Sequence, residues 1–175
     1  MATAKPQSAP TEREFSISRE FNAPRSLVWK ALTEADRLSQ WWGPKGCTIR
    51  VAKLDVRPGG IFHYAMAWQP GRDMWGRFIY REVETPQKLV YVSSFSDPNG
   101  GITRAPFKDT FPLEVLNVLT LSERAGKTTM ALHGHPLDAG EAERKTYIDM
   151  FGSMQQGFSG TFEQLDAYLA KAGGQ

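Results

Sequence analysis

The feature that most limits the possible folds of this chain is an apolar stripe near its C-terminus, between Asp138 and Ala170. Apolar residues recur there with the i, i+3, i+4, i+7 spacing of a helix that has one buried face. They are Tyr147, Met150, Phe151, Met154, Phe158, Phe162, Leu165, Tyr168 and Leu169. The spacing predicts one long helix, with Asp138 and Glu141 as a capping box at its start and Gly173 beyond its end.

Two features distinguish this predicted helix from an ordinary core helix. Gly152, Gly157 and Gly160 each cost about 1 kcal/mol relative to alanine in a helix interior. They favour close approach of another backbone or of a ligand, although glycine can also mark a bend. The first half of the stripe consists of Met and aromatic side chains, which fill irregular space. Because such a stripe most often belongs to an ordinary core, it does not by itself predict a binding site.

The residues before this helix predict strands joined by tight turns. A first strand at 15–21 is followed by two short helices, one opened by Pro24 and one capped by Thr33. Further strands are predicted at 48–56, 61–68, 74–83, 88–95, 109–122 and 127–133. Residues 96–108 predict a loop, of a length that is often functional. Successive short strands of this kind indicate an antiparallel meander.

A sheet with one dry face needs a cover, and the long helix offers a matching apolar stripe. We therefore predict an α+β fold in which a curved antiparallel sheet of about seven strands wraps around the C-terminal helix. Because a curved sheet and a cylinder cannot touch everywhere, we expect a cavity between them. The sequence predicts a single domain over residues 13–171, after a disordered polar tail at 1–12.

Composition argues against several classes of function. The net charge is +2 and no basic run occurs, so nothing favours a nucleic-acid partner. No apolar run reaches the roughly 20 residues that cross a bilayer, so no membrane insertion is expected. The single Cys47 excludes an internal disulfide, and the polar start of the sequence shows no signal-peptide pattern. These observations predict a cytoplasmic protein, either a monomer or a homodimer.

Four motifs resemble those of a known family, the one named after the activator of heat-shock protein 90 ATPase. They lie at 19–33, at 38–44 with Trp-Trp-Gly-Pro, at 55–60 with Arg-Pro-Gly-Gly, and at 85–90. The resemblance covers about residues 13–170 and implies the helix-grip fold of the START-like (SRPBCC) superfamily. It does not imply one function, since relatives act as co-chaperones, bind hydrophobic small molecules or act as polyketide cyclases. One departure is Gly157-Phe158, where the family usually carries Gly-Trp.

We expect apolar side chains from the sheet and the long helix to line the cavity. Alternation along 61–68 puts four apolar residues on one face, which should point inward, and His63 on the other face. The predicted wall consists of Phe62, Tyr64, Met66, Trp68, Tyr91, Phe95, Met150, Met154 and Phe158. Trp41 and Trp42 either complete the core or close the mouth of the cavity.

Several polar residues could add chemistry to this wall. Arg77 could bind an acidic ligand group if it points inward, and Ser93 could orient a ligand by hydrogen bonding. The pattern does not decide whether Arg77, Glu114 or Asn117 faces inward. A catalytic role would require a titratable residue inside the cavity, such as an inward Glu114 or His63.

No metal or cofactor is expected, because the pair His133 and His135 lacks further ligands and no cofactor motif occurs. The favoured interpretation is binding of a hydrophobic or amphipathic small molecule in the cavity. One alternative is a co-chaperone-like protein that stimulates a heat-shock protein 90 ATPase. Another is an enzyme of the cyclase or lyase type that acts on a polyketide-like or aromatic substrate, whose catalytic residues the sequence does not identify.

Overall fold

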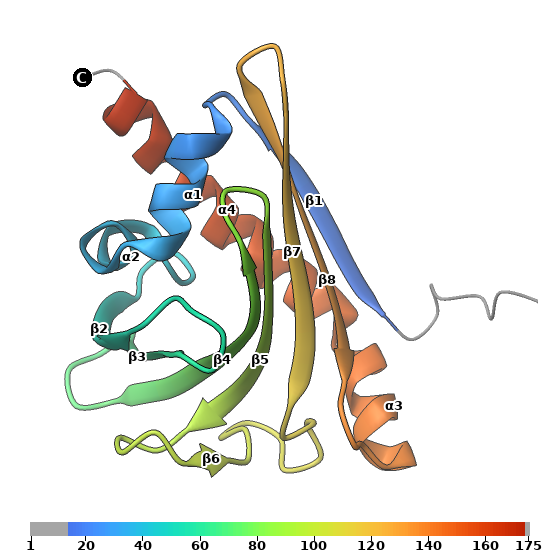
Figure 1. Cartoon of the computed structure of the whole chain (residues 1–175). Coiled ribbons are helices and arrows are strands. Elements are labelled where there is room, and N and C mark those ends of the chain that lie inside the picture. The colour runs from blue at the N-terminus through green and yellow to red at the C-terminus, as the bar shows by residue number, and fades with distance from the viewer. Residues whose placement is uncertain (1–13, 174–175) are drawn as a thin grey trace, which may run out of the picture.

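A curved antiparallel sheet and a C-terminal helix form the body of this protein, and two short helices lie beside that helix (Figure 1). The computed structural model describes residues 14–173, so the predicted tail at 1–12 lies outside the described residues. The observed architecture confirms the α+β fold with a curved sheet around the last helix. None of the helices within residues 14–173 is long and apolar enough to cross a membrane.

The sheet has eight strands in the order β1-β8-β7-β5-β4-β3-β2, with β6 paired to β5. Its strands are β1 (Phe15–Phe21), β2 (Thr48–Leu54), β3 (Ile61–Ala67), β4 (Asp73–Glu84), β5 (Lys88–Ser96), β6 (Ile102–Thr103), β7 (Val115–Arg124) and β8 (Lys127–Pro136). The helices are α1 (Arg25–Thr33), α2 (Ala35–Trp41), α3 (Glu141–Asp149) and α4 (Phe151–Gly173). All strand pairs are antiparallel, and the first strand returns to pair with the last.

The predicted single long helix is wrong, because the chain forms two helices that meet at Met150. Met150 has φ −93° and ψ 2°, which interrupts the helical path. The predicted capping box is also wrong. Asp138 lies outside α3 with φ 47°, whereas the N-cap is Gly140, whose N–H donates to the Glu143 carboxylate at 3.4 Å.

Two other predicted boundaries differ from the structure. Thr33 does not cap α2, because it is the last residue of α1 and its hydroxyl donates to the Trp29 carbonyl at 2.7 Å. Glu34 takes the N-cap position. The strand predicted at 109–122 begins only at Val115, since Pro112 lacks the N–H that a strand ladder needs.

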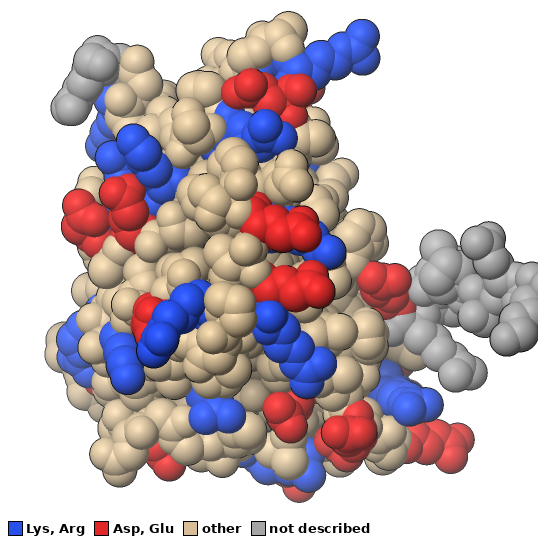
Figure 2. Space-filling view, viewed as in Figure 1, with Lys and Arg blue, Asp and Glu red and all other residues tan. Residues whose placement is uncertain are grey.

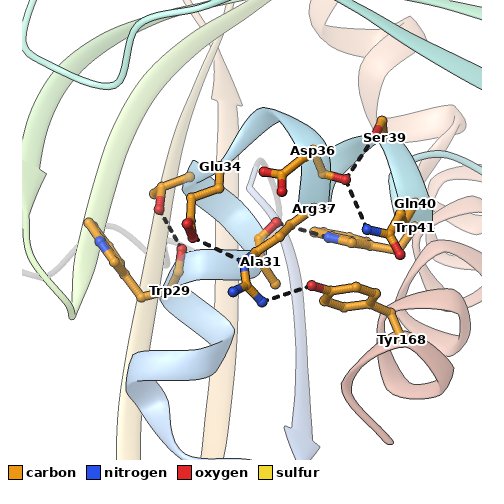
Figure 3. A network of polar contacts seen from close by, with 10 residues as sticks. Trp29, Ala31, Glu34, Asp36, Arg37, Ser39, Gln40, Trp41 and Tyr168 are labelled. Atoms are coloured by element: carbon orange, nitrogen blue, oxygen red, sulfur yellow. Dashed lines mark hydrogen bonds and ion pairs between the residues drawn. The ribbon is translucent and has the colours of Figure 1, made fainter. Parts of the chain in front are cut away.

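Arg37 joins α2 to α4 and fixes the short helices on the long one (Figure 3). Its Nη1 donates to the Tyr168 hydroxyl at 2.9 Å, and its Nε lies 3.0 Å from the Glu34 carboxylate. Trp41 is 1% exposed and donates Nε1–H to the Ala31 carbonyl at 2.9 Å. These contacts hold the end of α2 against the C-terminal half of α4.

Charged side chains are distributed over the surface without a dominant sign. Figure 2 shows acidic and basic side chains interspersed on the face that it presents. Nine ion pairs join Lys or Arg to Asp or Glu in the described residues, and most of them are partly exposed. This distribution agrees with the small net charge of +2.

Candidate functional site

A pocket of about 210 Å³ opens between the segment that follows α2, the strand β3 and the helix α4. Its wall is mostly apolar, and none of its lining residues carries a formal charge at neutral pH. The lining residues are Trp42, Gly43, Pro44, Tyr64, Met66, Met154, Gly157, Phe158 and Thr161. The pocket therefore lies at the seam between sheet and helix, where the sequence predicted a cavity.

The Trp-Trp-Gly-Pro segment is fixed onto α4 by polar contacts. Gln164 Nε2 donates to the Trp41 carbonyl at 3.3 Å and also to the Gly43 carbonyl. Lys45 and Glu163 form an ion pair at 2.6 Å. Backbone carbonyls at the C-terminal end of a helix have no partner within the helix. The side-chain amide of Gln164 donates to such carbonyls at the end of α2.

Gly43 is required by the path of this segment. Its φ is +97°, a conformation that only glycine adopts readily, and a Cβ there would lie 2.9 Å from Cys47 Sγ. The turn places Pro44 and the Trp42 ring in the wall of the pocket. Cys47 is partly buried, and burial raises the pKa of its thiol.

Trp42 forms the inner wall of the pocket. Its ring packs edge to face against Phe62, Tyr64 and Phe78, with ring centroids 5.6–6.0 Å apart. Trp42 also borders a small internal void of about 20 Å³ on the core side. The ring therefore separates the open pocket from the core.

Tyr64 is the buried polar residue of the sheet side of the pocket. Burial raises the pKa of its phenol to about 12. Gly76 faces Tyr64 on β4, and its lack of a side chain leaves room for the tyrosine ring. The phenol therefore stays neutral at physiological pH.

The helix side of the pocket comes from one face of α4. Thr161 donates its hydroxyl to the Gly157 carbonyl at 3.0 Å, one helical turn earlier. Of the close approach predicted at Gly152, Gly157 and Gly160, by another backbone or by a ligand, the part that named a backbone is wrong. Beyond the neighbouring backbone of α4 itself, no described heavy atom lies within 4 Å of a Cβ built at any of the three, and only Gly157 lines the pocket.

The structure brings five of the predicted site residues together at this pocket. They are Trp42, Tyr64, Met66, Met154 and Phe158. Sequence reasoning missed Gly43, Pro44 and Thr161, whereas it had singled out Gly157 for close approach of a backbone or a ligand. A signal existed for the first two, which directly follow the tryptophan pair, and for Thr161, which lies seven residues after Met154 on the same helical face.

The other predicted apolar residues do not line this pocket. Trp41 and Phe62 are each 1% exposed in the core, and Tyr91 borders the internal void. Phe95 packs against Phe107 and Phe111. Two further residues lie elsewhere: Met150 at the break between α3 and α4, and Trp68 beyond the end of β3, where it is 49% exposed.

The predicted polar anchors also lie outside the pocket. Arg77 pairs with His63 on the outer face of the sheet and donates Nη1–H to the Gly100 carbonyl at 2.8 Å. His63 is buried under the same loop, with Nε2 3.1 Å from the Asp97 carbonyl oxygen. The loop at 97–101 covers both residues, which sequence alternation could not indicate.

Glu114 and Asn117, whose facing the sequence pattern also left open, differ in position. Asn117 is buried on the inner face of β7, and its Nδ2 donates to Ser93 Oγ at 2.9 Å. Ser93 is therefore engaged by a neighbour in the sheet. Glu114 precedes β7, and its carbonyl accepts a hydrogen bond from Leu137 N–H at 2.9 Å.

Comparison with known proteins identifies relatives of this chain. The family model for Activator of Hsp90 ATPase homolog 1-like protein matches residues 22–170. The crystal structure of protein Ms6760 from Mycobacterium smegmatis is 27% identical with a TM-score of 0.72, covering 90% of this chain and 91% of that chain. The solution structure of a protein from Arthrobacter aurescens is 25% identical with a TM-score of 0.75, covering 91% of this chain and 87% of that chain.

A more distant structure shares the fold alone. The crystal structure of DynU16, from the dynemicin biosynthetic locus, is 18% identical with a TM-score of 0.63 and covers 91% of this chain and 48% of that chain. A search of curated proteins found no match. Because the family model spans most of the chain and the solved structures share its architecture, this chain belongs to the family of Activator of Hsp90 ATPase homolog 1-like proteins.

Proposed function

We propose that this protein binds a hydrophobic or amphipathic small molecule in the pocket between β3 and α4. The observation that carries the proposal is the open apolar pocket of about 210 Å³. A buried apolar cavity of about 150 Å³ can take up benzene, so the pocket has room for one or two aromatic rings or a short acyl chain. A larger ligand would extend from its open side into solvent.

The fold and the chemistry of the wall support binding. The fold of this family commonly binds hydrophobic ligands. Met66 and Met154 supply polarisable, adaptable contacts, and Gly157 leaves room that a side chain would take. None of the lining residues carries a carboxyl, imidazole or amino group for general acid–base catalysis. We therefore propose binding for this pocket.

A pair of leucine substitutions in α4 tests this proposal. Gly157→Leu places a side chain in the pocket, whereas Gly152→Leu places the same side chain on the exposed surface of the same helix. Titration with 2-acetylnaphthalene, followed by amide NMR shifts, should show binding by the wild type and by Gly152→Leu. Binding by Gly157→Leu should fall at least about tenfold, since its side chain occupies the ligand's place.

The control removes the effect of helix propensity, because both substitutions replace a helical glycine by leucine. Native mass spectrometry of gently purified protein would add the identity of any natural ligand. If 2-acetylnaphthalene, 2-ethylnaphthalene and a C8 acyl chain all fail to shift the pocket resonances of the wild type, the proposal is wrong.

The family description also names an activator of the Hsp90 ATPase. A pulldown with the Hsp90 homologue of the same cell would test whether this chain shares that partner. Gly157→Leu should leave such capture unchanged, because a chaperone would contact the outer surface and Gly157 lies in the pocket wall. Loss of capture in this variant would instead link the chaperone to the pocket.

A further inference from the structure

The side chains of the pocket wall offer few polar groups, and one of them is already engaged. The Thr161 hydroxyl donates to the Gly157 carbonyl at 3.0 Å. Trp42 Nε1 is buried and has no partner with hydrogen-bond geometry within residues 14–173. The Tyr64 hydroxyl is the remaining polar group. These two groups are therefore the side-chain candidates for contact with a ligand.

Both of these groups can donate to a ligand. An indole N–H can only donate, whereas a phenol can donate its O–H and its oxygen can also accept. Because Tyr64 lines the pocket, a ligand oxygen is the acceptor that this arrangement accommodates.

The charge of the wall limits the ligand further. The lining residues include no cation. The ammonium of Lys45, near the mouth, is paired with Glu163 at 2.6 Å. A carboxylate held inside the pocket would lose its hydration without gaining a cationic partner. A neutral carbonyl oxygen would lose far less hydration free energy and would accept a hydrogen bond from the phenol.

We propose that the pocket prefers uncharged aromatic ligands that carry a hydrogen-bond acceptor, such as aryl ketones, aldehydes or esters, over the corresponding acids and hydrocarbons. Tyr64 donates its O–H to the ligand oxygen. This proposal rests on the proposed function and names the ligand class for that site.

Three probes of nearly equal size test the preference. They are 2-acetylnaphthalene, 2-ethylnaphthalene and 2-naphthoate, titrated at pH 7 and followed by amide NMR shifts of the pocket residues. The ketone should bind about fivefold to tenfold more tightly than the hydrocarbon, as one net hydrogen bond allows, and the carboxylate should bind most weakly. Tyr64→Phe should lower the affinity for the ketone to that for the hydrocarbon.

Tyr168→Phe is the matched control, because it makes the same change at a tyrosine of α4 that lies outside the pocket and accepts a hydrogen bond from Arg37. This variant should keep the preference for the ketone. A measurement on the wild type alone covers the case in which Tyr64→Phe fails to fold: the infrared carbonyl stretch of bound 2-acetylnaphthalene should lie below its value in cyclohexane. An unshifted stretch would overturn the donated hydrogen bond.

The outcomes separate this inference from the proposed function. Equal affinities for the three probes, or tightest binding of 2-naphthoate, would overturn the ligand class and leave small-molecule binding in place. Failure of every probe, the C8 acyl chain included, would overturn both. Retention of the ketone preference by Tyr64→Phe would show that Tyr64 is not the donor.

Discussion

Gly76 lies directly opposite Tyr64 across the β3–β4 ladder, and a Cβ at residue 76 would lie 2.6 Å from the Tyr64 hydroxyl oxygen. Such a distance is too short for any real contact, so either the ring or the strand must move. Because Tyr64 is 9% exposed and packed against Trp42 and Phe78, the ring has little room to do so.

Gly76→Ala should therefore destabilise the protein by about 1–3 kcal/mol, the range for overpacking a core, as measured by chemical denaturation. It should also weaken ligand binding, because the displaced ring lines the pocket. The same substitution in a Tyr64→Leu background should be much less destabilising, since the flexible leucine can yield. Equal destabilisation in both backgrounds would show that the contact with Tyr64 is not the cause.

Gln164→Glu should loosen the segment that carries Trp42. The substitution removes the donor to the carbonyls of Trp41 and Gly43 and places a carboxylate beside them, for a loss of about 1–3 kcal/mol in unfolding free energy. The affinity for 2-acetylnaphthalene should fall as well. Gln156→Glu, on the exposed face of the same helix, makes the same charge change and should alter neither measurement.

Gly152→Ala and Gly160→Ala should each stabilise the protein by about 0.5–1 kcal/mol. Both lie in α4, and beyond the neighbouring backbone of that helix no described heavy atom lies within 4 Å of a Cβ built at either one. The added methyl group therefore restricts the unfolded chain without a clash. Thermal and chemical denaturation measure the effect, and a decrease in stability at either site would point to a contact that this structure does not contain.

Stability should fall steeply as the pH rises above about 10. The ordinary pKa of tyrosine is about 10, and burial raises that of Tyr64 to about 12. The Tyr64 phenol then loses its proton at a lower pH in the unfolded chain than in the folded chain. Its contribution to the free energy of unfolding is therefore complete below pH 10 and is lost toward pH 12. Burial also raises the pKa of Tyr80, Tyr91 and Tyr147.

Tyr64→Phe isolates one of these groups from the others. The loss of unfolding free energy between about pH 9 and 12 should be smaller in the variant by about 2–3 kcal/mol, since one proton per molecule no longer titrates over about two pH units. Urea denaturation at a series of pH values measures the difference. Identical slopes in the two proteins would mean that Tyr64 titrates with an ordinary pKa.

Arg77→Gln should affect a loop and leave the pocket intact. The guanidinium donates to the Gly100 carbonyl at 2.8 Å on the outer face of the sheet, so its removal should speed amide hydrogen exchange at 97–101. Affinity for 2-acetylnaphthalene should stay within about twofold of the wild type. Arg81 is exposed on the same strand, and Arg81→Gln should change neither the hydrogen exchange at 97–101 nor the affinity for 2-acetylnaphthalene. A large loss of affinity in Arg77→Gln would contradict the placement of Arg77.

Local sequence patterns predicted most elements because they report a residue's position on its own strand or helix. Alternation placed Phe62, Tyr64 and Met66 on one face of β3, and this face does meet the helix layer. The boundaries were less secure. The break falls at Met150 itself, two residues before the glycine at 152 that could have marked it, and the cap at Gly140 offers no side chain for a pattern to detect.

The sequence by itself determined the elements of this protein, the direction of the apolar faces and the family motifs around the Trp-Trp-Gly-Pro segment. Only the tertiary structure decided which inward residues border open space. Tyr64 and Met66 line the pocket, whereas Phe62, on the same face, is covered by the Trp42 ring. The physical reason is that a pocket forms where side chains from distant segments fail to fill a volume, and periodicity within one element carries no information about that volume.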